Sequence, residues 1–175
     1  TGIIYIPSHN AWSVMPLRKT VPEDESTLAY VQNRRGARPT MARGLPLVKP
    51  PYSRMTAIDM NTGEHVWMVP TGDGNRFRRN PLLRDLDLPP LGGDATRNGP
   101  LVTKTLLLYS LTAGGTNDGP QLVAYDKATG EELGSLDLPG AGVSNPMTYL
   151  LDGKQYIGMT VGGDPPGLIA LGLPD

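Results

Sequence analysis

Few residues in this 175-residue chain have the types and spacing that catalysis or metal binding requires. His9 and His65 form no His-x-x-x-His pair, so each is expected to be a surface or packing residue rather than a metal ligand. The acidic run at 23–25 lacks the alternating Asp/Asn and the turn Gly of a calcium loop, which favours solvated charge. The absence of Cys excludes disulfides, thiolate chemistry and Cys-ligated zinc.

Two basic runs and two Gly-Gly pairs are the next candidates for ligand binding. The basic runs lie at 34–38 and 76–79, with Phe77 the one aromatic in either, and the formal net charge is −1. We therefore expect solvated loop charges and no nucleic-acid partner, with a phosphate-binding or nucleic-acid patch as the alternative. Neither Gly114-Gly115 nor Gly162-Gly163 is followed by Gly-Lys-Ser/Thr, so both pairs are expected to end strands rather than hold phosphate.

Short β-strands are the elements expected to position these residues. The chain has 22 Gly and 18 Pro, and no stretch keeps a 3.6-residue apolar period. No apolar run reaches the roughly 18 residues that cross a bilayer. The sequence therefore predicts an all-β chain with long inserted loops at about 11–51 and 71–98. The predicted strands cover residues 2–7, 54–60, 64–70, 100–104, 106–110, 121–126, 132–138, 145–151, 154–161 and 167–173.

One strand–turn–strand unit occurs twice. Residues 56–64 and 123–131 share Ala, Asp, Thr, Gly and Glu in register, 67 residues apart, and such a repeat is typical of a propeller or solenoid. Gly63 is expected to supply a positive φ in the turn, and Asp59 to accept hydrogen bonds from the turn backbone. Trp67 is expected to pack against a neighbouring blade. Asp152-Gly153, between two apolar runs, predicts a type I′ hairpin.

The first repeat has the pattern Ala-x-Asp-x-x-Thr-Gly-x-x-x-Trp, and it resembles the tryptophan-docking motif of pyrroloquinoline-quinone (PQQ)-dependent quinoprotein dehydrogenases. The run Leu-Val-Lys-Pro-Pro-Tyr-Ser-Arg-Met-Thr-Ala-Ile-Asp at 47–59 is similar to the membrane glucose and polyol dehydrogenase branch. So is the tail, with Pro-Met-Thr-Tyr at 146–149 and Asp-Gly-Lys-Gln-Tyr-Ile at 152–157. The second repeat departs from the motif, because Gly134 stands at the position of the docking Trp.

The resemblance implies an eight-bladed propeller of four-stranded antiparallel blades. This chain is then expected to be a C-terminal fragment with about two and two-thirds of those blades, over residues 1–175. The chain begins directly on the apolar run at 3–6, which we interpret as the middle of a sheet. The remaining N-terminal blades of the parent chain are the expected partner, and they are expected to supply the missing outer strand of the last blade.

The same resemblance implies a function. The family oxidises a sugar, polyol or alcohol with PQQ and a divalent metal, usually calcium, and the parent is expected to be periplasm-facing and membrane-associated, with membrane quinone as electron acceptor. The catalytic Asp and the metal ligands are expected upstream, so no catalytic or metal-binding residue is assigned here, and the fragment alone is expected to be inactive. Asn10 and Asp118 are the expected cofactor contacts. The alternatives are a turn-capping role for Asn10, a plain hairpin turn at Asp118, and for the whole protein a non-catalytic propeller scaffold or a carbohydrate-binding β protein.

Overall fold

The structure, a computed structural model, describes residues 2–33 and 39–172. The chain divides into two compact units, one formed by residues 10–49 and the other by the rest of the chain. The strands are β1 (Ile3–His9), β2 (Leu17–Lys19), β3 (Tyr30–Gln32), β4 (Ser53–Asp59), β5 (His65–Pro70), β6 (Leu101–Val102), β7 (Leu106–Leu111), β8 (Gln121–Asp126), β9 (Glu132–Asp137), β10 (Met147–Leu151), β11 (Lys154–Val161) and β12 (Gly167–Gly172). One short helix, α1 (Asn75–Arg78), completes the set together with three 3₁₀ turns at Pro22–Asp24, Ala42–Gly44 and Thr116–Asp118.

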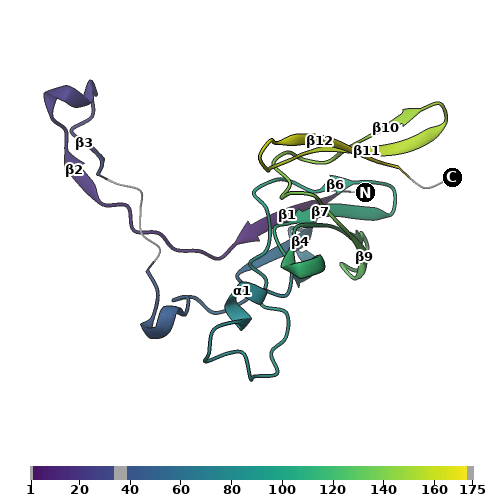
Figure 1. Cartoon of the computed structure of the whole chain (residues 1–175), viewed down its shortest axis with the longest axis horizontal. Helices are drawn as coiled ribbons and strands as arrows, with labels where there is room; N and C mark the ends of the chain where they lie inside the picture. The colour runs from purple at the N-terminus through teal and green to yellow at the C-terminus, as the bar shows by residue number, and fades with distance from the viewer. Residues whose placement is uncertain (1, 34–38, 173–175) are drawn as a thin grey trace. The chain divides into compact units, whose positions relative to one another are not determined.

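The larger unit contains three antiparallel sheets (Figure 1). Their strand orders are β1-β4-β5, β6-β7-β8-β9 and β10-β11-β12. All ten predicted strands are present, each with bounds within two residues of those expected, except that residue 173 lies outside the described residues. The all-β class and the antiparallel four-stranded blade are therefore confirmed, with one complete blade between two three-stranded ones.

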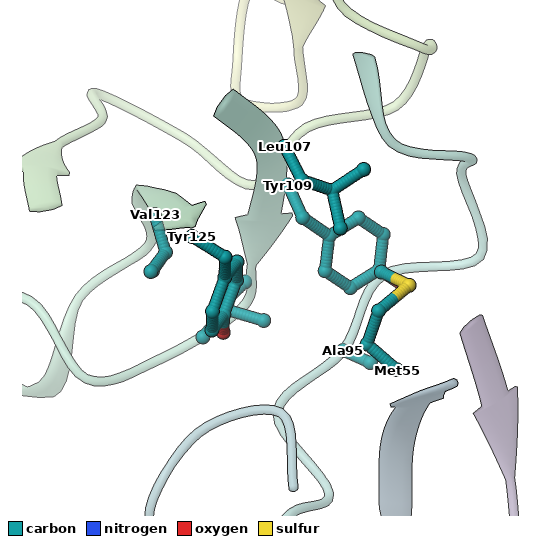
Figure 2. Close-up of a cluster of buried hydrophobic side chains, with 7 residues drawn as sticks. Met55, Ala95, Leu107, Tyr109, Val123 and Tyr125 are labelled. Atoms are coloured by element: carbon teal, nitrogen blue, oxygen red, sulfur yellow. The ribbon is translucent and has the colours of Figure 1, made fainter. Parts of the chain in front are cut away.

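The middle sheet is covered on both faces, which explains why β7 is apolar along nearly its whole length. Successive side chains of a strand point to opposite faces. Tyr109 and its neighbours at alternate positions pack with Met55 of β4 and with Trp67, whereas Leu108 packs with Met159 of β11. Figure 2 shows the first of these two clusters, in which Met55 lies against the ring of Tyr109. Two separate apolar layers thus join the three sheets in chain order.

The turns agree with the sequence predictions. Asp152 and Gly153 both have positive φ, 50° and 80°, as the type I′ turn between β10 and β11 requires. Gly63 has φ 75°, and Asp59 accepts a hydrogen bond from the Asn61 N–H at 2.8 Å. These local features are confirmed as expected.

The unit formed by residues 10–49 contains secondary structure that the sequence did not predict. β2 and β3 pair as a short antiparallel hairpin within the segment expected to be a loop. Asp24 is also more than a solvated charge, because it accepts two hydrogen bonds from the Arg18 guanidinium and one from the Val21 N–H. The Arg18 contact, helped by the Val21 N–H, lowers the pKa of Asp24 to about 2. The basic run at 34–38 lies outside the described residues.

In the part of the chain that the structure describes, no helix has the length and hydropathy to cross a membrane.

Candidate functional site

Asp118 lies at the end of the 3₁₀ turn Thr116–Asp118, which connects β7 to β8. Asn117 and Asp118 have φ of 56° and 61°, a left-handed conformation that is uncommon for residues other than Gly and that costs backbone energy. The Thr116 N–H donates to Asp137 Oδ1 of β9 at 2.9 Å, which fastens the turn to the neighbouring strand. The connection between β7 and β8 is therefore a turn with two residues in the left-handed conformation, fixed to β9 by a hydrogen bond, rather than a two-residue hairpin.

Two side chains from the segment after β5 hold the Asp118 carboxylate. Asn75 Nδ2 donates to Asp118 Oδ1 at 2.9 Å, and Arg79 Nη2 forms an ion pair with Oδ2. The Asp118 side chain is only 20% exposed. A carboxylate with both oxygens engaged, one of them by a guanidinium, is oriented as well as charged.

The segment that presents Asn75 and Arg79 is anchored by two buried polar residues. Ser53 Oγ accepts a hydrogen bond from the Gly93 N–H at 2.6 Å and donates to the Thr71 carbonyl. Asp94, 1% exposed, accepts from the Gly74 N–H at 2.7 Å, immediately before α1. Burial raises the pKa of the Asp94 carboxyl, while the Gly74 N–H opposes that rise. The residue immediately before α1 is thus fixed by a hydrogen bond that is shielded from water.

Arg78 of α1 is held by backbone carbonyls rather than by a carboxylate. Its Nε donates to the Asp73 carbonyl at 3.0 Å, and its Nη2 donates to the carbonyls of Leu88 and Pro89 at 2.7 and 2.8 Å. A pocket of about 370 Å³ lies beside it. The residues that line this pocket are Asn75, Arg78, Arg79 and Arg84. Two of the four also hold Asp118, so the predicted site residue adjoins a basic pocket that the sequence did not reveal.

Asn10 belongs to the unit of residues 10–49, and Asp118 to the larger unit. The Asn10 side chain is exposed, and its Nδ2 donates to the Lys49 carbonyl at 3.2 Å. This bond links the two ends of the smaller unit, and the contact of Asn10 with the cofactor stays a prediction. His9 Nε2 lies 3.3 Å from the Thr96 carbonyl, so His9 has a packing partner.

Trp67 joins the first sheet to the second, as predicted. Its Nε1 donates to the Lys127 carbonyl at 3.1 Å, and its indole covers Gly130, where an added Cβ would lie 2.7 Å from the ring. The Tyr5 hydroxyl donates to the same Lys127 carbonyl at 3.1 Å. The partnership of Tyr5 was not predicted, although its position in an alternating strand places it on the Trp67 face.

Among residues 2–33 and 39–172, no group of three or more His, Asp or Glu side chains is arranged to hold a metal ion.

Known proteins resemble this chain over most of its length. The family model described as "PQQ: Glucose/ethanol/alcohol dehydrogenase, beta-propeller domain" matches residues 6–157. The glycerol dehydrogenase large subunit of Gluconobacter thailandicus is 36% identical over 121 residues, which cover 69% of this chain and 16% of that protein. The quinate/shikimate dehydrogenase (quinone) of Acinetobacter baylyi is 35% identical over 128 residues, covering 70% of this chain and 15% of that protein.

Two solved structures share the fold. The quinohemoprotein alcohol dehydrogenase from Comamonas testosteroni aligns with TM-score 0.56 and 22% identity over 92% of this chain and 20% of its own. A europium-containing methanol dehydrogenase aligns with TM-score 0.56 and 22% identity, over 92% of this chain and 23% of its own. The chain spans about a sixth of the length of the curated relatives it matches.

Proposed function

Because the chain belongs to the glucose/ethanol/alcohol dehydrogenase β-propeller family, we propose that it supplies the last blades of a PQQ-dependent oxidoreductase. The proposed substrate is a sugar or polyol, and the proposed electron acceptor is membrane quinone. The observation that carries the proposal is the family match over residues 6–157, which covers the second sheet and parts of the first and third. Relatives named for glycerol, quinate/shikimate and glucose support the choice of a polyhydroxylated substrate.

The residues around Asp118 fit one edge of the proposed cofactor. PQQ presents ring N–H, carbonyl and carboxylate groups, and a site for it needs both hydrogen-bond acceptors and cationic donors. Asp118 supplies an acceptor, and Arg79 and Asn75 supply donors beside it. We propose that Asp118 contacts the cofactor and that Asn10 is the second contact. The divalent metal is proposed to be held mainly by the remaining blades of the parent protein.

In this proposal the chain's own residues orient rather than react. Bound PQQ would supply the hydride acceptor for oxidation of the alcohol carbon. Arg79 holds the Asp118 carboxylate in one orientation, in which it can accept a hydrogen bond from the cofactor. The buried Asp94–Gly74 hydrogen bond keeps α1, and with it Asn75 and Arg79, in place for that task.

The proposed location is periplasm-facing and membrane-associated in the parent protein, and the chain alone is proposed to be inactive. The remaining blades are its proposed partner, since the chain covers only about a sixth of the length of the relatives it matches.

The test is oxidation of glucose and glycerol by the parent protein, reconstituted with PQQ and Ca²⁺ and followed with an artificial electron acceptor. We expect activity that requires both additions and that falls at least about tenfold in Asp118→Asn, since a charge-assisted contact is worth roughly 1.5–3 kcal/mol. Asp152→Asn, on the exposed β10–β11 turn, is the matched control and should keep full activity. Absence of PQQ-dependent oxidation of any sugar or polyol would refute the proposal.

A further inference from the structure

The basic pocket beside Asp118 has the chemistry of a carboxylate-binding site. Three of its four lining residues are arginines, and the fourth, Asn75, has an amide. Its volume of about 370 Å³ lies within the range of small-molecule pockets, near the lower end. The sequence pointed to Arg76–Arg79 as a basic run but gave no reason to expect Arg84 beside it.

Arg78 and Arg79 are held in place by hydrogen bonds and yet keep donors for a ligand. Each guanidinium has five N–H groups. Arg78 uses its Nε and its Nη2 on three backbone carbonyls, and Arg79 uses Nη2 on Asp118. Within the described part of the chain, these hydrogen bonds leave Nη1 of both Arg78 and Arg79 available to a ligand. A guanidinium that is already oriented loses less side-chain entropy when it binds a ligand.

The residues that line the pocket carry three positive charges. Two of them are paired with carboxylates, Arg79 with Asp118 and Arg84 with Asp85. The Asp85 pair with Arg84 is weak, because the two atoms are 3.4 Å apart and the side chains are 64% and 83% exposed. An anion can therefore compete for Arg84 at little cost.

We propose that Asn75, Arg78, Arg79 and Arg84 bind the carboxylate group of a small organic acid. The planar guanidinium fork matches a carboxylate with two parallel hydrogen bonds, and Asn75 adds an amide beside it. As a statement about a substrate, this rests on the proposed function, since a hydroxy acid offers an alcohol to oxidise and a carboxylate to hold. As a statement about binding, it stands on the pocket alone. Because PQQ also bears carboxylates, the same chemistry has two possible sources.

The experiment is isothermal titration of the full chain with meso-tartrate and with erythritol, at low salt. These four-carbon compounds differ only in that tartrate has carboxylates at both ends where erythritol has alcohols. We expect tartrate to bind at least about tenfold more tightly than erythritol. Arg84→Gln should weaken tartrate about tenfold, whereas Arg97→Gln, which removes the same charge at an exposed position outside the pocket, should change Kd less than about twofold. Both arginines are exposed, so neither variant is expected to lower the melting temperature.

Two further arms identify the source and the specificity. If PQQ displaces tartrate competitively and Arg84→Gln weakens both, the carboxylate in the pocket belongs to the cofactor; if both bind together, it belongs to the substrate. Inorganic phosphate is the comparison anion and should bind more weakly than tartrate. Equal Kd values for tartrate and erythritol, equal losses in the two arginine variants, or phosphate binding as tight as tartrate would each overturn the proposal. The titration measures binding without turnover. Tartrate binding can therefore be observed even if the parent protein oxidises no sugar or polyol, and oxidation can be observed even if tartrate does not bind.

Discussion

The two repeats of the chain have the same turn but different strands after it. Asp59 accepts from the Asn61 N–H at 2.8 Å, and Asp126 accepts from the Ala128 N–H at 2.7 Å. The register shifts at the same place in both, between positions 57 and 58 and between 124 and 125. Gly63 has φ 75° and Gly130 has φ 77°. The local backbone is thus reproduced almost residue by residue.

The strand after each turn decides how the sheets are joined. Trp67 lies opposite Ala57 in the first repeat, and Gly134 lies opposite Ala124 in the second. Trp67 reaches the Gly130 turn of the next sheet, whereas a Cβ at Gly134 would meet nothing within 4 Å. Turn geometry therefore depends on the short repeat itself, while contact between sheets depends on one side chain outside it.

Replacing Trp67 should give the largest effect. Trp67→Ala removes the indole from Gly130 and the hydrogen bond to the Lys127 carbonyl, and it exposes Tyr5, whose ring centroid lies 5.7 Å away. We expect a loss of about 3 kcal/mol in the free energy of unfolding, measured by urea denaturation. Trp12→Ala, at a side chain 64% exposed, is the control and should cost less than about 0.5 kcal/mol. Equal losses in the two variants would contradict the joining role of Trp67.

The two turn glycines separate backbone strain from the packing of Trp67. Gly63→Ala should cost about 1 kcal/mol, because φ is positive but the new Cβ enters open space. Gly130→Ala has the same backbone cost plus a clash, since its Cβ would lie 2.7 Å from the Trp67 ring, and should lose about 1–3 kcal/mol more. In a Trp67→Ala background the two substitutions should cost the same, which a double-mutant cycle measures. A Gly130 cost that stays higher in that background would have another cause.

Replacing Gly134, which stands where the motif has its docking Trp, should have a smaller effect than these losses, and it should stabilise the fold. Gly134→Val replaces a strand glycine with a β-branched residue where a Cβ has room, so we expect stabilisation of about 0.5–1 kcal/mol by thermal unfolding. Gly158→Val in β11 is the matched strand control: a Cβ there already lies 3.6 Å from Met147 and Tyr149, so less gain is expected. Destabilisation by Gly134→Val would show that the gap opposite Ala124 is required.

The carboxylates of the two turns, Asp59 and Asp126, should contribute to stability with the same dependence on pH, so no difference between the repeats is expected here. Hydrogen bonds from the turn backbone, from Asn61 and from Thr129 and Ala128 respectively, lower the pKa of both Asp59 and Asp126. A lowered folded-state pKa adds stability above the unfolded pKa, and that stability is lost as pH falls through the folded value. Asp59→Ala and Asp126→Ala should therefore destabilise at neutral pH, with a difference from the parent that vanishes in acid. Unfolding measured across the acid-to-neutral range would contradict this if either difference stayed constant.

The sequence predicted the strands of the larger unit because, apart from the two-residue β6, each of them has at least five residues. It did not predict β2 and β3, because three-residue strands such as Leu17–Lys19 and Tyr30–Gln32 show no period. Their pairing depends on a ten-residue connection stabilised by the Arg18–Asp24 ion pair, which no local pattern encodes.

The neighbourhood of Asp118 was predicted only in part. The residue was identified from a family resemblance, and its role in cofactor binding stays a prediction. Its partners could not be identified, because Asn75 and Arg79 come from 43 and 39 positions earlier and reach it only through the anchoring of α1 by Asp94 and Ser53. No pattern in the sequence predicted that Arg84 lines the pocket, because Arg84 lies outside the basic run at 76–79 and reaches the pocket only in the folded chain.

The acceptor that Trp67 and Tyr5 share is a main-chain oxygen, that of Lys127. Every amino acid has that oxygen, so the joint between the two sheets does not depend on which side chain stands at position 127. Substitutions can accumulate there over evolution without removing either hydrogen bond, while the donors at 5 and 67 cannot change without loss. The Lys127 ammonium has a separate partner, the Thr103 carbonyl at 3.1 Å, so a substitution at 127 would remove that contact and leave the joint between the sheets in place.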